Sequence, residues 1–287
     1  EDKMAKKSRK NRGIKGSPPN HLGQHLLHNK KVISEIVQLA QPGPNEIVLE
    51  IGAGKGALTE AISQKAKKVL AVEYDEKFIR KLDEKMANNK NVMIIHQDIL
   101  KMPLPRGNFI VISNIPYAIT TSIMKKLLKN PSTGFQRGVI MMEKGAAKRF
   151  TSKMVKDPYV AAWRMWFHIR YVKEISRRNF APPPKVDSAI IAIERKKQPL
   201  VPCSDYLVFW GLVDHVLKNP YLDIQFALKG IFTGPQIKRL KQNLRIKGEF
   251  PIGALSEQHW GIIYETMVKY VPKFKWPKIK KGKIGSY

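Results

Sequence analysis

Cysteine and acidic residues are scarce in this 287-residue chain, which has one cysteine, Cys203, and 23 acids against 52 lysines and arginines. A single cysteine excludes a disulfide framework and a metal site built on several cysteines. No apolar run approaches the roughly 18 residues that a membrane-spanning helix needs, and the charged N-terminus lacks the pattern of a secretory signal. We therefore expect a cytoplasmic protein with neither a membrane nor a metal partner.

The excess of positive charge is large, with a formal net charge of +29. Such an excess costs self-repulsion in the folded state, and a polyanionic partner is the simplest reason to carry it. Much of it lies at the two ends of the chain. Residues 1–16 hold seven lysines and arginines, and residues 273–287 hold six lysines and no acid. We interpret residues 1–20 as a basic, disordered arm and residues 273–287 as a lysine-rich tail, both suited to nucleic acid.

Strand and helix patterns alternate from residue 46 onwards. Short buried strands are expected at 46–51, 69–73, 92–96, 109–113 and 137–142, and helices at 56–66, 75–88, 119–130 and 143–153. This alternation predicts parallel βαβ units in a doubly wound α/β sheet, with a site at the carboxyl ends of the first strands. Two later segments, 159–175 and 186–194, are interpreted as strands that close the sheet as an antiparallel hairpin.

The C-terminal third lacks this alternation. Prolines at 199 and 202 mark a linker, and helices are expected at 204–218, 234–243 and 256–270. We therefore divide the chain into the arm 1–20, an α/β domain at 21–198, a small all-helical RNA-binding domain at 199–272 and the tail 273–287. One further helix is expected ahead of the α/β pattern, at about 30–40.

Residues 50–57 read EIGAGKGA between an apolar run and a helical pattern, which predicts a strand, a glycine turn and a helix. Glycines let the backbone turn tightly and let a ligand approach, and a helix N-terminus offers free N–H groups. Glu73 ends the second strand, where a carboxylate suits the two hydroxyls of a ribose. The spacing also satisfies the loose fingerprint of a nicotinamide dinucleotide site, so that alternative stays open at this point.

Polar residues follow the third and fourth strands as well. Asp98 follows the third strand and could accept a hydrogen bond from a ring amine, or merely cap the next helix. Residues 114–117 read NIPY. The Asn114 side-chain oxygen and the Ile115 carbonyl could accept both hydrogens of an adenine amine, and Tyr117 could stack on the base. Ordinary turn chemistry is the alternative, since Asn and Pro both favour turns.

Together these motifs resemble those of S-adenosylmethionine-dependent RNA adenine-N6 methyltransferases. Supporting stretches are GQHLL at 23–27, MEKGAAKRF at 142–150 and FAPPPKVDS at 180–188. The resemblance implies a Rossmann-like class I methyltransferase fold with a small helical C-terminal domain and S-adenosyl-L-methionine as cofactor. The cofactor contacts that it implies are His25, Leu27, Gly52, Glu73, Asp98, Ile99 and Asn114. The catalytic residues that it implies are Asn114, Tyr117 and Phe180, the last covering the target base from its other side.

The family has two branches. Ile115 and the sequence EKG at residues 143–145 favour the Erm branch. The members of this branch methylate 23S rRNA and confer macrolide–lincosamide–streptogramin B resistance. The expected partner is therefore rRNA, either protein-free 23S rRNA or an early assembly precursor, bound by a monomer. Three alternatives remain. They are a KsgA/Dim-like small-subunit rRNA dimethyltransferase, a non-catalytic RNA-binding relative, and an NAD-dependent oxidoreductase, which would leave the charge and the NIPY turn unexplained.

Overall fold

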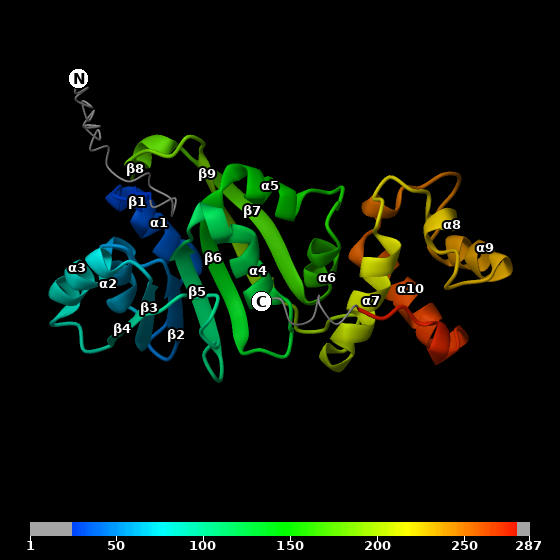
Figure 1. Cartoon of the computed structure of the whole chain (residues 1–287), viewed down its shortest axis with the longest axis horizontal. Coiled ribbons are helices and arrows are strands. Elements are labelled where there is room, and N and C mark those ends of the chain that lie inside the picture. Colours follow the sequence, from blue (N-terminus) through cyan, green and yellow to red (C-terminus); the bar gives the residue numbers. More distant parts are fainter. Residues whose placement is uncertain (1–24, 280–287) are drawn as a thin grey trace, which may run out of the picture.

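The computed structural model describes residues 25–279, so the arm at 1–20 and the last eight residues lie outside the described part. A seven-stranded sheet forms the centre of the molecule (Figure 1). Its strands, in spatial order, are β4 (Val92–His96), β3 (Lys68–Glu73), β2 (Ile47–Ile51), β5 (Phe109–Asn114), β6 (Phe135–Glu143), β9 (Ser188–Arg195) and β7 (Phe167–Ile175).

The first five strands are parallel, and β9 pairs antiparallel with both β6 and β7. From β2 the chain proceeds outward to β3 and β4, then returns to β5 on the other side of β2 and continues to β6. The strand order therefore reverses between β2 and β5. In open α/β sheets this switch point opens a crevice at the carboxyl ends of the strands. The parallel sheet and the closing antiparallel hairpin that the sequence predicts are both confirmed.

Helices cover both faces of the sheet. Side chains of α1 (Lys30–Ala40), α2 (Ala57–Ser63) and α3 (Glu76–Met86) share one apolar cluster with one face. Those of α4 (Thr120–Leu128), α5 (Lys144–Thr151) and α6 (Pro158–Trp166) share a second cluster with the other face. In α1 the apolar positions Val32, Ile33, Ile36 and Val37 recur at helical spacing and are buried, and Asn29 caps its N-terminus.

The predicted strand at 159–175 is wrong in its first half, because residues 158–166 form α6. Pro158 occupies the first helical turn, where its missing N–H costs nothing. The aromatic side chains that suggested a strand, Trp163 and Trp166 among them, are buried between α5, α7 and the sheet. Tertiary burial thus overrides the β-propensity of these residues. Strand β7 begins only at Phe167.

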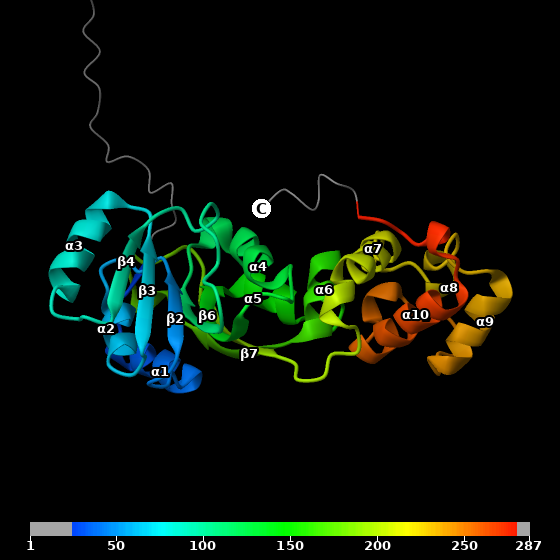
Figure 2. The same cartoon turned by 90° about the horizontal axis from the view of Figure 1, so that it is seen from below.

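The C-terminal region is helical, as predicted, and comprises α7 (Tyr206–Val216), α8 (Ile224–Ala227), α9 (Gly234–Asn243) and α10 (Glu257–Tyr270). Both views place α8–α10 at the end of the molecule opposite β4 (Figures 1 and 2). The apolar core of the α/β region continues into these helices. The ring centroid of Phe209 in α7 lies 5.4 Å from that of Trp166 in α6 and 6.4 Å from that of Trp260 in α10, edge-on in both cases. Among residues 25–279, no helix is long and apolar enough to cross a membrane.

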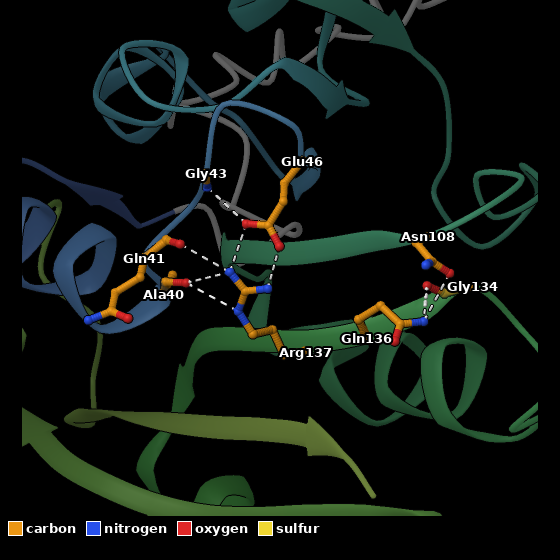
Figure 3. A network of polar contacts seen from close by, with 8 residues as sticks. All are labelled: Ala40, Gln41, Gly43, Glu46, Asn108, Gly134, Gln136 and Arg137. Carbon is orange, nitrogen blue, oxygen red and sulfur yellow. Dashed lines mark hydrogen bonds and ion pairs between the residues drawn. The ribbon is translucent and has the colours of Figure 1, made fainter. Parts of the chain in front are cut away.

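An arginine network ties the amino edge of the sheet together (Figure 3). The Arg137 guanidinium at the start of β6 donates to both carboxylate oxygens of Glu46, just before β2, and to the carbonyls of Ala40 and Gln41 at the end of α1. The hydrogen bond from Arg137 lowers the pKa of Glu46. These contacts fix the strands at the edge opposite the predicted site and leave the carboxyl edge free for ligands.

Candidate active site

A cavity of about 610 Å³ opens at the carboxyl ends of β2, β3 and β5. It brings together residues that lie up to 156 positions apart in the sequence, from His25 to Ala181. Eight of the predicted site residues line it, namely His25, Leu27, Gly52, Glu73, Asp98, Ile99, Asn114 and Tyr117. The remaining one, Phe180, does not. The switch point of the sheet is therefore where the sequence motifs converge.

The glycine turn after β2 forms the floor of this cavity. Gly52 has φ +76° and Gly54 has φ +55°, a region that only glycine adopts without strain. A Cβ on Gly52 would lie 3.3 Å from Cδ of Pro116, and one on Gly54 would lie 2.8 Å from Cδ2 of Leu26. The glycines thus let the turn pack directly against the NIPY segment on one side and against residues 25–27 on the other.

The Glu73 carboxylate locks this turn to the end of β3. Its Oε2 accepts the Gly54 N–H at 2.8 Å, and its Oε1 accepts the N–H groups of Tyr74 and Asp75 at 2.8 and 2.9 Å. A carboxylate has about four acceptor positions, so roughly one is left for a ligand hydroxyl. Glu73 is 6% exposed and faces the cavity. Its role as the ribose ligand stays a prediction that this geometry accommodates.

Asp98 and Ile99 line the cavity beyond β4, next to the end of β3. The Asp98 Oδ1 accepts the Leu100 N–H at 2.9 Å within a turn, and β5 is the next element, so Asp98 caps no helix here. The same carboxylate has further acceptor positions for a ring amine. Ile99 is buried and supplies an apolar wall. Their contact with an adenine ring remains a prediction.

Asn114 is the last residue of β5, and of its two side-chain amide atoms only the nitrogen is hydrogen-bonded. Its Nδ2 donates to the His25 carbonyl at 3.2 Å, and its Oδ1 is buried with no hydrogen-bond partner among the described residues. Burying an acceptor without a donor costs about 1–3 kcal/mol. A ligand N–H group would satisfy it, which is the requirement for holding an amine. This unpaired oxygen is the feature of the cavity that most directly indicates a nitrogen-bearing substrate.

Tyr117 begins a short 3₁₀ helix, Tyr117–Ile119, at the mouth of the cavity. Its hydroxyl is hydrogen-bonded to Ser188 Oγ at the start of β9. Burial raises the pKa of the Tyr117 phenol, which keeps the ring neutral. The His25 ring lies 5.5 Å from that of Tyr117, and His25 Nδ1 donates to the Pro182 carbonyl at 2.9 Å.

Phe180 lies outside the cavity. It belongs to β8 (Phe180–Ala181), which pairs with β1 (Leu26–Leu27), and its side chain is 2% exposed within the apolar cluster that α1, α2 and α3 share with one face of the sheet. From this position the ring supports Leu27, and the neighbouring Ala181 lines the cavity instead. The predicted role of Phe180 in covering the target base therefore stays a prediction, and this conformation does not place the ring beside Tyr117.

Glu50 has no predicted role, yet it lies in the wall of the cavity and is 2% exposed. Its Oε2 has no hydrogen-bond partner within residues 25–279. Burial raises the pKa of Glu50 to about 8, and the nearby charge of Glu73 acts in the same direction. The sequence did carry a signal for Glu50, because it is an acid inside the apolar run IVLEI.

No group of three metal-ligating His, Cys, Asp or Glu side chains occurs in the described part of the chain.

Comparison with known proteins identifies the family. Residues 19–269 match the family described as "Ribosomal RNA adenine dimethylase". The chain belongs to this family. As a member of the rRNA adenine dimethylase family it is a methyltransferase, and the nicotinamide alternative is discarded.

Three similar proteins illustrate the range of the family. An rRNA adenine N-6-methyltransferase of Bacillus licheniformis is 55% identical over 98% of this chain and 99% of its own length. A ribosomal RNA small subunit methyltransferase A of Bacillus thuringiensis (strain Al Hakam) is 36% identical over 67% of this chain and 70% of its own length. The crystal structure of the 23S rRNA methyltransferase ErmE shares the Rossmann-like fold, with a TM-score of 0.76 and 24% identity over 85% of this chain and all of that one.

Proposed function

We propose that this enzyme transfers methyl groups from S-adenosyl-L-methionine to the exocyclic N6 of one adenine in 23S rRNA. Methylation there would protect the ribosome against macrolide, lincosamide and streptogramin B antibiotics. The observation that carries the chemistry is the unpaired Oδ1 of Asn114 in the cavity. The observation that favours the Erm branch over the KsgA/Dim branch is the lower similarity to the enzyme named for the small subunit, 36% identity over 67% of the chain, against 55% over 98% for the rRNA adenine N-6-methyltransferase, whose name gives no subunit.

The cavity suits the cofactor in size and in donor set. A volume of about 610 Å³ lies within the range of small-molecule sites. The turn at Gly52 would face the methionine part, the remaining acceptor position of Glu73 the ribose, and Asp98 with Ile99 the adenine. When bound, the cofactor supplies a methyl group that is already activated by its sulfonium.

The residues of this chain then have to hold and orient the substrate amine. The lone pair of an adenine amine is delocalised into the ring, so the amine is a poor nucleophile. We infer that Asn114 Oδ1 and the Ile115 carbonyl accept its two hydrogens and direct the nitrogen into the cavity. Tyr117 would stack on the extruded base, and such stacking is worth roughly 1–3 kcal/mol per base. Alignment is the main task, since a fixed geometry converts a bimolecular step into an effectively unimolecular one.

The target RNA is tested by transfer of tritiated methyl groups to two substrates, protein-free 23S rRNA and small-subunit particles. Primer extension then locates the modified adenine. Label on a single adenine of free 23S rRNA is the expected result. Label confined to small-subunit particles would instead assign the enzyme to the KsgA/Dim branch, which the similarity to the small-subunit methyltransferase keeps as the second candidate.

The role of Asn114 is tested by Asn114→Ala. We expect methyl transfer to fall at least 100-fold, because the substrate amine loses its acceptor, while affinity for S-adenosylmethionine stays within about threefold of wild type. Asn108→Ala is the matched control, since Asn108 directly precedes β5 and Asn114 ends it. Near-normal turnover of the Asn114 variant would remove this residue from the mechanism.

A further inference from the structure

The hydrogen bond between the Tyr117 hydroxyl and Ser188 Oγ joins two parts of the sheet that are not neighbours. Tyr117 follows β5, Ser188 begins β9, and β6 lies between these two strands. Ser188 is fully buried, with no exposed surface. The side chain therefore reaches across the carboxyl end of β6 and attaches the outer end of the NIPY segment to the antiparallel part of the sheet.

Ser188 itself is held on both sides. In the strand register it pairs with Glu143 of β6 and with Ile175 of β7. The preceding residue, Asp187, accepts the Lys144 N–H on its carbonyl at 3.0 Å and the Arg177 N–H on its Oδ1 at 2.9 Å. The hydroxyl of Ser188 is thus anchored, because strand pairing on both sides and two hydrogen bonds to Asp187 hold the backbone around it.

The face of the Tyr117 ring is supported from another direction. The His25 ring lies 5.5 Å away at an interplanar angle of 44°, and it is itself held by the Pro182 carbonyl. The His25 backbone carbonyl also accepts Asn114 Nδ2. Tyr117 is therefore held at its backbone by the 3₁₀ turn, at its hydroxyl by Ser188 and along its ring by His25, which is more support than packing alone requires of a partly buried aromatic side chain.

We propose that Ser188 is a positioning residue, which holds the Tyr117 ring in the plane that an extruded target base stacks on. This inference rests on the proposed function, in which Tyr117 contacts the base. A tyrosine that has lost its hydroxyl partner can rotate about its side-chain bonds, and a misplaced stacking surface costs rate in the chemical step more than binding of the cofactor. Ser188 acts entirely through Tyr117 and touches neither the cofactor nor the RNA.

A double-mutant cycle of Ser188→Ala, Tyr117→Phe and the double variant tests this role. Each protein is assayed at saturating S-adenosylmethionine on whichever RNA substrate, free 23S rRNA or small-subunit particles, the wild-type enzyme labels. We expect Ser188→Ala to lower kcat about 3- to 10-fold, the range for one lost neutral hydrogen bond, with the Kd for S-adenosylmethionine unchanged. In the Tyr117→Phe background the same substitution should change kcat by less than about twofold.

Ser63→Ala serves as the matched control. Ser63 is 7% exposed, donates to the Glu60 carbonyl at 2.8 Å and accepts Asn89 Nδ2 at 3.0 Å, at the end of α2 away from the cavity. It should lower the unfolding temperature as Ser188→Ala does and leave kcat unchanged.

Equal losses of kcat from Ser188→Ala in the wild-type and Tyr117→Phe backgrounds would overturn the proposal, because they would show a role independent of the phenol. An unchanged kcat in Ser188→Ala would overturn it as well. Since the cycle uses the RNA that wild type labels, a failure of the 23S assignment leaves this test intact.

Discussion

Replacing Glu50 by glutamine should stabilise this methyltransferase at neutral and alkaline pH. Glu50 is almost completely buried, its Oε2 has no hydrogen-bond partner among the described residues, and burial raises its pKa to about 8 from an ordinary value of 4.5. The folded chain therefore favours the protonated acid. Glutamine has the same shape and no charge, so it removes the need to keep a proton bound or to bury a carboxylate.

The size and sign of the effect follow from proton linkage. Below pH 4.5 the carboxyl is protonated in both the folded and the unfolded chain, and the raised pKa costs nothing. As pH rises from 4.5 to about 8, the unfolded chain releases the proton and the folded chain retains it, so stability falls; above about 8 the loss is complete. At about 1.4 kcal/mol per pKa unit the full loss is at most roughly 5 kcal/mol, and relaxation of the site reduces it to about 2–4 kcal/mol.

The assay is thermal unfolding of wild type and Glu50→Gln between pH 5 and pH 8.5. One kcal/mol shifts Tm by about 2 °C in a chain of this size, so the variant should gain about 4–8 °C at pH 8.5 and little at pH 5. Glu84→Gln, at an exposed position of α3, makes the same change in net charge and should not alter the pH dependence. Parallel Tm curves for wild type and Glu50→Gln would refute the reasoning.

Three further predictions follow from other parts of the structure. Gly54→Ala should cost about 1–3 kcal/mol and weaken cofactor binding, because φ +55° strains alanine; an unchanged unfolding temperature would contradict this. Arg137→Ala should cost about 1–2 kcal/mol in urea unfolding and leave kcat unaltered, since the Arg137 and Glu46 side chains are 34% and 31% exposed and lie at the edge of the sheet opposite the cavity. Affinity for rRNA, measured by filter binding, should fall steeply with salt because of the +29 charge, and a flat response would exclude phosphate contacts as its main source.

The sequence was informative wherever local chemistry and periodicity agree. The strands carry short apolar runs and the helices carry apolar residues at a spacing of 3.6, so the alternation at 46–142 predicts the parallel half of the sheet correctly. The motif residues end those strands, and parallel strands bring their carboxyl ends to one edge. Convergence of six of the eight predicted residues on one cavity follows from that topology, whereas His25 and Leu27 are brought there by β1, which pairs with β8 outside the main sheet.

Where local and tertiary preferences disagree, the sequence misled. Residues 158–166 are rich in aromatic side chains that suit a strand, but they lie between helices and the sheet, where a helix buries them more completely. Phe180 keeps its predicted role as a prediction, but only the pairing of β8 with β1 shows that its ring packs in the apolar cluster that α1, α2 and α3 share with the sheet. No local pattern reports either kind of packing, because both depend on elements distant in sequence.

The sequence by itself determined the fold class, the family and the residues that end the first four strands, because hydrophobic period, glycine turns and motif chemistry are local properties. Only the tertiary structure decided which of those residues meet and what each lacks. It left Asn114 Oδ1 without a partner, buried Glu50 as an acid with a raised pKa, and joined Tyr117 to Ser188 across β6. Burial and hydrogen-bond satisfaction belong to the assembled molecule, since they depend on what surrounds a group and not on the group itself.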